Sequence, residues 1–361
     1  MRPALATAVL GIALVLVAGT FDAEPLYVPG LAFVLLPLAT ALWIAVTARG
    51  VGVRRELGAR RVVEEEPLDV SLQIASGRLP LSTGLVADAF LREPVPLAAG
   101  RRSQRVRIVA RFARRGRRAL PPPAVVLRDP VGLVTRRVDA AEADEVLVLP
   151  RTERVRSVGA GDEEGRHRRG RPAIAAEVEL DGVRELREGT PASRIYWPAL
   201  ARGAGLMERR LRAESDSTPL VVLDARGTAD HEEELDKAVR ACASLALSLA
   251  RAGGCAVLLP GDRRATALDP TLGGWAHLHA RLALVAPGGG PSMSGVAGRS
   301  GLVVYVAARV PSRAPRALEH APAAGRVLVV PGQMAGLRAS FTVCGCTGYA
   351  VEPGRAGRRA A

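Results

Sequence analysis

The residues that decide the fold lie at the N-terminus, where Pro3–Phe21 reads PALATAVLGIALVLVAGTF and Pro25–Ala48 reads PLYVPGLAFVLLPLATALWIAVTA. Neither stretch contains a charged residue, and a short polar turn with Asp22 and Glu24 separates them. About 20 apolar residues in a helix cross the ~30 Å hydrocarbon core of a bilayer, so each stretch is long enough to span a membrane. The sequence therefore predicts a transmembrane α-hairpin over residues 1–50, with no ionisable group that would indicate an ion path.

The charges that flank the hairpin predict its orientation. Arg2 precedes the first span, and the second span is followed by Arg49, Arg54, Arg55, Arg60 and Arg61. Because basic residues favour the cytoplasmic side, we expect a two-span protein of the cell membrane with both termini and the soluble domains in the cytoplasm. A cleaved signal peptide ending near Ala18 or Ala23 is the alternative, and the second apolar span that follows at once argues against it.

The amino-acid composition limits the classes of partner that we expect the protein to bind. The chain has 361 residues, a formal net charge of +14 and a sequence pI near 11.0, which could indicate nucleic acid or an anionic membrane surface. Lys237 is the only lysine, so the basic charge is almost entirely arginine, as in proteins from GC-rich genomes. No block combines basic with aromatic residues, as stacking on bases requires, so we do not expect nucleic acid as the main partner.

The cysteine residues do not predict a zinc site. Cys242 and Cys255 fall in apolar helix and strand patterns, and Cys344 and Cys346 are predicted to share one strand and face the same side. Two further ligands at zinc spacing are missing from the sequence around them. We therefore expect reduced, mostly buried thiols.

Residues 51–150 have the pattern of an all-β sandwich. Leu68–Ile74 and Val106–Phe112 alternate apolar and polar residues, whereas Val125–Leu127 and Val146–Leu149 are short apolar runs. Pro121–Pro123 must lie in a turn or at a sheet edge. The region contains no cluster of His, Cys or paired acids, so a structural or protein-contact role is expected.

The second half predicts an α/β domain. We expect residues 151–218 to be a linker followed by a sequence motif described below, and residues 151–171 of it to be a solvated loop. Residues 219–350 are expected to form the α/β domain, and residues 351–361 a basic tail. Continuous apolar strands separated by helices predict a mostly parallel, Rossmann-like sheet covered on both faces. Ligands of such sheets bind at the carboxyl ends of strands, which singles out Asp224. The expected strands are Pro219–Leu223, Cys255–Leu259, Leu302–Val306, Arg326–Val330 and one beginning at Phe341–Val343, and the expected helices are Glu232–Arg251 and Trp275–Val285.

Two separated motifs resemble one family. The first comprises Arg114–Arg118, Asp129–Leu133 and Val146–Arg151, and the second runs from Val183 to Leu211. In this order they resemble the bacterial membrane proteins grouped as domain of unknown function fifty-eight, which carry a von Willebrand factor A-like domain. Leu186, Thr190 and Pro198 depart from the signature. The matching residues are Arg184, Glu185, Gly189, Arg194, Ile195, Trp197, Ala201, Arg202 and Leu206.

The resemblance implies an interaction protein. Members of the family are often encoded beside MoxR-type AAA+ ATPases and transglutaminase-like membrane proteins, which are the partners it implies, in complex assembly or envelope processes. The residues that would mark this role are Arg184, Glu185, Gly189, Arg194, Trp197 and Arg202, although Tyr196 and Trp197 among arginines and glutamates also fit a structural core.

The resemblance also raises the question of a metal. Domains of this type often hold a divalent cation with Asp-x-Ser-x-Ser at the end of the first strand, and hard oxygen ligands suit Mg²⁺. Here the segment reads Asp224-Ala225-Arg226-Gly227-Thr228, in which Asp224 and Thr228 are candidate ligands. Arg226 brings its own positive charge and could pair with Asp224 in place of the cation.

Known catalytic motifs are missing from the sequence. It contains no Walker loop, no G-x-S-x-G and no H-E-x-x-H, and Gly288–Gly290 is expected to be a flexible connection. The leading hypothesis is thus a membrane-anchored, non-enzymatic adaptor. The alternatives are a metal-dependent ligand binder or enzyme centred on Asp224, and an envelope protein with external domains.

Overall fold

The computed structural model describes residues 2–158, 183–185, 203, 205, 207–209, 218–228, 230–292, 301–321 and 323–351. The chain divides into two compact units. The first comprises Met1–Ala113 and Arg117–Val148, and the second comprises Arg114–Gly116 and Leu149–Ala361.

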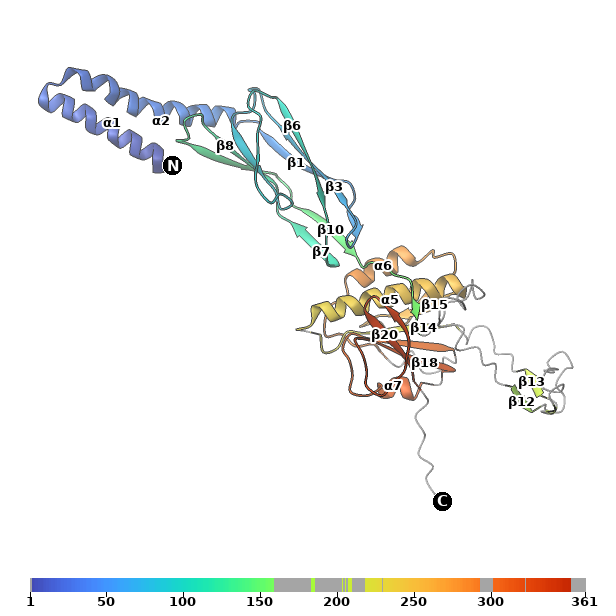
Figure 1. Ribbon diagram of the computed structural model, residues 1–361. Coiled ribbons are helices and arrows are strands. Elements are labelled where there is room, and N and C mark those ends of the chain that lie inside the picture. Colours follow the sequence, from blue (N-terminus) through green and yellow to red (C-terminus); the bar gives the residue numbers. More distant parts are fainter. Residues whose placement is uncertain are drawn as a thin grey trace. The chain divides into compact units, whose positions relative to one another are not determined.

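Two apolar helices begin the first unit and pack side by side (Figure 1). Helix α1 (Arg2–Phe21) and helix α2 (Tyr27–Thr47) are joined by the short 3-10 helix η1 (Glu24–Leu26). Both helices are long and apolar enough to cross a membrane. The helices meet through small residues: a Cβ on Gly11 would lie only 2.7 Å from the carbonyl oxygen of Gly30. Small residues of this kind let helix backbones approach closely in a membrane.

The end of α2 is part of the core of the β-region. Ile44 and Ala48 are buried in one cluster with strand residues such as Leu72 and Val125. Beyond the helix the chain turns at Gly50, which has φ +81°. A Cβ on Gly77 would lie 2.5 Å from the carbonyl oxygen of Arg49, so the two segments touch through their backbones. The C-terminal end of α2 and the residues that follow it are therefore packed against the β-region, and we call this contact the packed joint.

Two sheets of the β-region are antiparallel, as its alternating sequence predicts. The first sheet has the order β1 (Gly52–Leu57), β3 (Leu68–Ala75), β6 (Ser103–Ala110), and the second the order β5 (Val95–Pro96), β4 (Gly84–Ala87), β8 (Ala124–Arg128), β9 (Thr135–Asp139). A third joins β2 (Arg61–Val63), β10 (Asp144–Leu149) and β7 (Gly116–Leu120).

Two apolar clusters fill the β-region. Inward residues of β1 and β3 and those of β4 and β8 bury one core between them, including Val53, Leu72, Val86 and Leu127. A smaller cluster includes Val70 and Val148. The strands expected at Leu68–Ile74, Val106–Phe112, Val125–Leu127 and Val146–Leu149 are confirmed within one to three residues, and Pro121–Pro123 connects β7 to β8.

Arg55 is not one of the exposed flanking charges, contrary to what the sequence suggested. Its side chain is 0% exposed and ion-paired with Asp88 at 2.6 Å and Asp144 at 3.1 Å. It also donates to the Pro121 carbonyl oxygen at 2.7 Å. Arg55 therefore holds strands of the β-region together instead of adding to the exposed positive charge beside the hairpin.

The second unit is built on an eight-stranded mixed sheet. Its four central strands, β18-β17-β14-β15, are parallel, as expected, and β16, β20, β19 and β11 add antiparallel strands at the two sides. The strands are β11 (Arg156–Ser157), β14 (Leu220–Asp224), β15 (Cys255–Leu258), β16 (Thr266–Leu268), β17 (Leu302–Ala307), β18 (Gly325–Pro331), β19 (Ala339–Val343) and β20 (Cys346–Ala350). Because β11 lies within 151–171, that stretch is not wholly a solvated loop.

Helices cover both faces of the sheet. Alternate residues of β14, β17 and β18 pack with helices α5 (Glu232–Gly253) and α6 (Trp275–Ala283) on one face, and with the short helix α7 (Arg316–Glu319) on the other. Helix α5 begins with three glutamates in its first turn, whose negative charge stabilises the positive N-terminal end of the helix dipole. The helix ends before Gly254, which has φ +98°. The continuous apolar strands thus reflect burial on both sides.

The predicted placement of two cysteines on one strand is wrong. Cys344 and Gly345 form the two-residue turn between β19 and β20, with φ of +49° and +75°. A hairpin of this length favours positive φ at both positions because that twist matches the strands. Of these two, only Cys346 lies on a strand, and all four cysteines are buried and free, as expected.

Candidate functional site

The candidate site lies where the strand order of the parallel sheet reverses. In chain order β14 is followed by β15 on one side and by β17 on the other. The carboxyl ends of β14 and β17 therefore lie side by side, with Asp224 opposite Ala307 in register. Ligands of doubly wound sheets bind at such a switch point. The sequence singled out Asp224, and the structure places it at this position.

Glycines shape the turn that follows Asp224. The backbone of Ala225 exchanges hydrogen bonds with the segment that the sequence predicts to be a flexible connection: its N–H donates to the Gly289 oxygen at 2.9 Å, and its oxygen accepts from the Gly288 N–H at 2.8 Å. A Cβ on Gly290 would lie 2.8 Å from Cδ of Arg226. The Gly288–Gly290 segment is thus tied to the turn and leaves space for the Arg226 side chain.

Arg226 and Tyr305 saturate the carboxylate of Asp224. Arg226 Nε donates to Oδ1 at 2.9 Å and to Oδ2 at 3.1 Å, and its Nη2 donates to Oδ2 at 2.7 Å. The Tyr305 hydroxyl, from β17, donates to Oδ2 at 2.5 Å, and Arg226 Nη2 in turn reaches that hydroxyl oxygen at 3.1 Å. The three residues form one hydrogen-bonded centre, which we call the Asp224 centre.

The electrostatics of this centre follow from burial and pairing. Burial alone would raise the pKa of the Asp224 carboxyl, but the hydrogen bonds from Arg226 and Tyr305 outweigh it and hold the pKa below its usual range. Burial, followed by the hydrogen bond to Asp224, raises the pKa of the Tyr305 phenol. The hydrogen bond to Asp224 raises the pKa of Arg226. At neutral pH the centre is therefore an ion pair with a neutral phenol beside it.

The residues present fit a divalent cation poorly. Both carboxylate oxygens of Asp224 accept from Arg226, and the buried Thr228 hydroxyl donates to the Ala225 carbonyl oxygen at 2.7 Å. Within the described parts of the chain, no three His, Cys, Asp or Glu side chains are grouped to hold a metal ion. A dication at Asp224 would have to displace a guanidinium whose positive charge occupies the same place.

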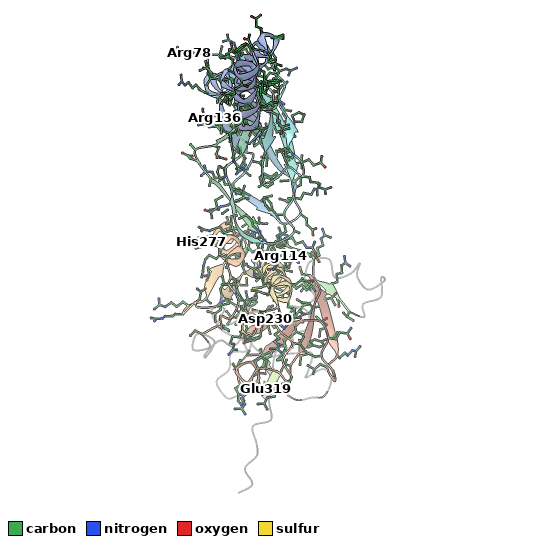
Figure 2. The ribbon with its side chains drawn as sticks, turned by 90° about the vertical axis from the view of Figure 1, so that its left-hand side faces the viewer. Arg78, Arg114, Arg136, Asp230, His277 and Glu319 are labelled. Carbon is green, nitrogen blue, oxygen red and sulfur yellow. The ribbon has the colours of Figure 1, made fainter. Side chains whose placement is uncertain are left out.

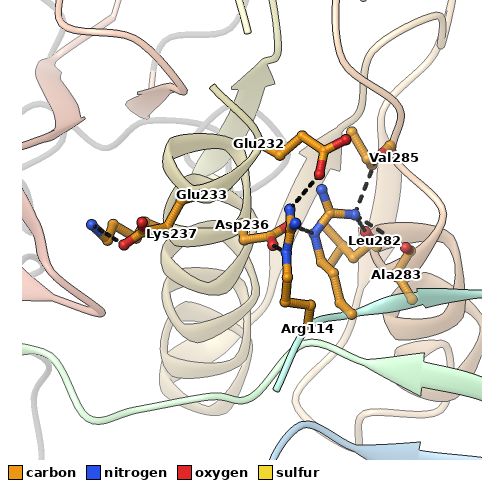
Figure 3. A network of polar contacts seen from close by, with 9 residues as sticks. Arg114, Glu232, Glu233, Asp236, Lys237, Leu282, Ala283 and Val285 are labelled. Atoms are coloured by element: carbon orange, nitrogen blue, oxygen red, sulfur yellow. Dashed lines mark hydrogen bonds and ion pairs between the residues drawn. The ribbon is translucent and has the colours of Figure 1, made fainter. Parts of the chain in front are cut away.

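A second polar cluster in this unit involves the first family-like motif (Figure 3). Arg114 pairs with Glu232 at 2.8 Å and with Asp236 at 2.9 Å, and Arg115 pairs with Asp236 at 3.0 Å. Arg115 Nη1 also donates to the carbonyl oxygens of residues 282, 283 and 285 at 3.0–3.1 Å. These carbonyls end helix α6, where a cation satisfies unpaired oxygens and the negative helix end.

The second family-like motif is described only in part. Arg184 and Glu185 lie on β12 (Val183–Glu185), which pairs with β13 (Met207–Arg209), so that Arg184 is opposite Glu208. Gly189, Arg194, Trp197 and Arg202 lie outside the described residues. The partner role of these residues therefore stays a prediction.

The sequence did not single out Tyr305 or Asp236 as site residues. Tyr305 is 0% exposed and is the one aromatic residue in an otherwise aliphatic buried strand. A buried tyrosine needs a partner for its hydroxyl, and the end of a neighbouring parallel strand offered one. Asp236 is likewise buried, in the first turns of α5, and a buried carboxylate needs a cation.

No family model and no curated protein matches the chain. Among solved structures, the chain is weakly similar to the Pseudomonas fluorescens alkylpurine DNA glycosylase AlkC bound to DNA containing an abasic site analog. The sequence identity is 15%, the TM-score is 0.17, and the alignment covers 37% of this chain and 41% of that chain. So low a TM-score supports no conclusion about fold or function.

Proposed function

We propose that the protein is a membrane-anchored interaction module without catalytic activity. In this proposal the α1–α2 hairpin spans the cell membrane and holds the remaining chain at its cytoplasmic face. The second unit, which we propose to be von Willebrand factor A-like, contacts the partner. The partner is a MoxR-type AAA+ ATPase, and a transglutaminase-like membrane protein is the second partner that the family resemblance implies.

The observation that carries the proposal is the Asp224 centre. The position where a doubly wound sheet binds its ligand holds an internal ion pair in place of an open carboxylate. The Arg226 side chain is nevertheless 62% exposed, and its Nη1 makes no hydrogen bond to any described residue. An exposed guanidinium next to a buried acid offers N–H donors to an acidic side chain of a partner protein. This chemistry favours binding over metal-assisted catalysis.

Affinity purification of the full chain from the membranes of its native host, with and without ATP, tests the proposal. We expect an AAA+ ATPase to be enriched by the wild type and by the control Arg309→Ala, an exposed arginine next to the same turn. Arg226→Glu should reduce the enrichment, because it reverses the charge at the contact. If no AAA+ ATPase is recovered with the wild type under either condition, the proposed partner is wrong.

The competing function, a metal-dependent binder or enzyme, is separated by calorimetry with Mg²⁺ or Mn²⁺ on the purified chain. We expect no binding isotherm, because Arg226 holds the oxygens that a cation would need. Heat of binding that disappears in Asp224→Ala would support the metal-dependent alternative instead.

A further inference from the structure

One end of the β-region lies next to helix α2. Gly77 touches the backbone of Arg49 and Gly50, directly after the helix. Residues 76–83 are hydrogen-bonded to the two neighbouring loops: the Ser76 N–H donates to the Arg102 oxygen at 2.8 Å, and the Arg128 N–H donates to the Thr83 oxygen at 2.8 Å. Figure 2 shows Arg78 and Arg136 at the same end of the first unit as the two helices.

This end of the β-region carries positive charge that is not neutralised by ion pairs with described acids. We call the exposed arginines of this end the arginine rim: Arg49, Arg78, Arg101, Arg102, Arg128 and Arg136. None of them forms an ion pair with a described acidic residue. The only acid within residues 76–83, 98–102 and 128–136 is Asp129, which is 1% exposed.

Asp129 shapes an apolar tip beside the rim. Its carboxylate accepts from the N–H groups of Val131 at 3.1 Å and Val134 at 2.7 Å, and Gly132 turns the chain with φ +78°. The turn leaves Val131 57% exposed at its outer end. An exposed valine in a turn flanked by Arg128 and Arg136 suits an interface that is apolar below and anionic above.

The height of the rim relative to a bilayer follows from α2. Its 21 residues, at about 1.5 Å each, span roughly the 30 Å of a hydrocarbon core. Tyr27 and Trp43, near the two ends of the helix, are 44% and 51% exposed, and such aromatic residues are enriched at membrane interfaces. Gly50 comes within one turn after the end of α2, so the loop that touches it lies at the level of the headgroups.

We propose that the arginine rim binds the anionic phospholipid headgroups of the bilayer that the hairpin spans, with Val131 inserted at the interface. The proposal rests on the proposed membrane anchor. It gives the β-region a role at the membrane surface, because the rim and the packed joint together fix the angle between the β-region and the membrane. Arginine guanidinium groups match phosphate oxygens bidentately, and several near one anionic surface act together.

The test uses the full chain in nanodiscs of phosphatidylcholine, with or without phosphatidylglycerol. Val131→Cys carries an environment-sensitive fluorophore, and Ala141→Cys, exposed on the loop between β9 and β10, is the control site. The buried native thiols should not compete for the label. We expect a blue shift at position 131 that increases with phosphatidylglycerol, and none at 141. Equal emission at the two sites would overturn the proposal.

A charge-matched pair of variants tests the arginines themselves. The rim variant combines Arg78→Gln, Arg101→Gln and Arg136→Gln, and the control combines Arg60→Gln, Arg61→Gln and Arg92→Gln, which are exposed elsewhere on the β-region. We expect the rim variant to retain about two-fold less phosphatidylglycerol per chain after detergent extraction than the wild type, and the control to retain the same amount. Equal retention by all three would overturn the proposal.

Sedimentation after an alkaline carbonate wash keeps the two failures apart. If the chain is washed off the vesicles, the membrane anchor itself is wrong. If the chain stays in the vesicles but shows no dependence on phosphatidylglycerol, only the proposed rim is wrong.

Discussion

Removal of the Arg226 guanidinium should destabilise the second unit by about 2 kcal/mol at neutral pH. Asp224, whose side chain is 11% exposed, would lose the hydrogen bonds from Nε and Nη2. It would keep the Tyr305 hydroxyl at 2.5 Å and the backbone N–H of residue 226 at 3.1 Å, so it would not be an orphaned charge costing about 3–5 kcal/mol. A hydrogen bond to a charged group contributes about 1.5–3 kcal/mol, and water competes here because Arg226 is 62% exposed.

The sign of the pH dependence is also set by this centre. The Asp224 pKa is held below its ordinary value of about 3.9, so its contribution to stability is present above that value and is lost as the pH falls through the folded-state pKa. Arg226→Ala should raise that pKa. The difference in unfolding free energy between the wild type and Arg226→Ala should therefore be full at neutral pH and shrink below about pH 4.

Hydrogen exchange of the full chain, followed by mass spectrometry on peptides from α5, measures the unfolding free energy of this unit alone. Arg309→Ala is the control and should change it by less than about 0.5 kcal/mol, as a surface substitution does. In an Asp224→Asn background the effect of Arg226→Ala should largely disappear, because the partner charge is gone. An Arg226→Ala variant as stable as the control would refute the importance of the ion pair.

Three further predictions concern other parts of the chain. Arg55→Met should destabilise the first unit by about 3 kcal/mol, because it leaves the buried Asp88 side chain with the Phe90 N–H but without a counter-charge. Arg55→Met with Asp88→Leu should recover part of the loss, and exchange of β3 and β6 peptides measures both. Gly11→Val should separate the two helices of the hairpin and lower the thermal stability of the hairpin in detergent. Ile12→Val, at an exposed position, should leave that stability unchanged. Burial and a hydrogen bond raise the pKa of Tyr305 in the folded chain. Its contribution to the free energy of unfolding is therefore present below the ordinary tyrosine pKa of about 10 and is lost as the pH rises through the folded-state pKa. Tyr305→Phe should remove this alkaline loss of stability, as measured by unfolding at a series of pH values.

The elements that the sequence predicted are those whose pattern is local. The hairpin helices are long apolar runs, and every residue of β14 is buried, so its continuous apolar sequence directly reports burial on two faces. The apolar positions Leu235, Val239, Cys242, Leu245 and Leu249, which recur with a period near 3.6 residues, indicated α5 in the same way. In these cases the periodicity of side chains and their burial are the same property.

The elements that the sequence missed depend on distant partners. The antiparallel strands β11, β16 and β20 have two to five residues each, and pairing with a neighbour defines them more than their own composition does. The Cys344 turn was missed because cysteine is unusual at positive φ, and Gly345 alone was the signal.

Pairs of side chains that lie far apart in the sequence could not be predicted from it either. The pairing of Asp224 with Arg226 could be suggested, because the two residues are only two positions apart in one motif. Tyr305 lies 81 residues from Asp224, and Asp236 lies 122 residues from Arg114, so no spacing indicates these contacts. Burial of a polar side chain is the property that would have revealed them, and it becomes known only with the fold.

The side of the membrane that the soluble units occupy decides between the proposed functions, and a reporter fused after Ala361 measures it in intact cells. A fusion to green fluorescent protein, which fluoresces in the cytoplasm, should be bright, and a fusion to alkaline phosphatase, which is active only outside it, should be inactive. A bright fluorescent fusion would place the proposed partner surface where an AAA+ ATPase works. Active phosphatase with a dark fluorescent fusion would contradict both the topology and the adaptor function, and would favour an envelope protein with external domains.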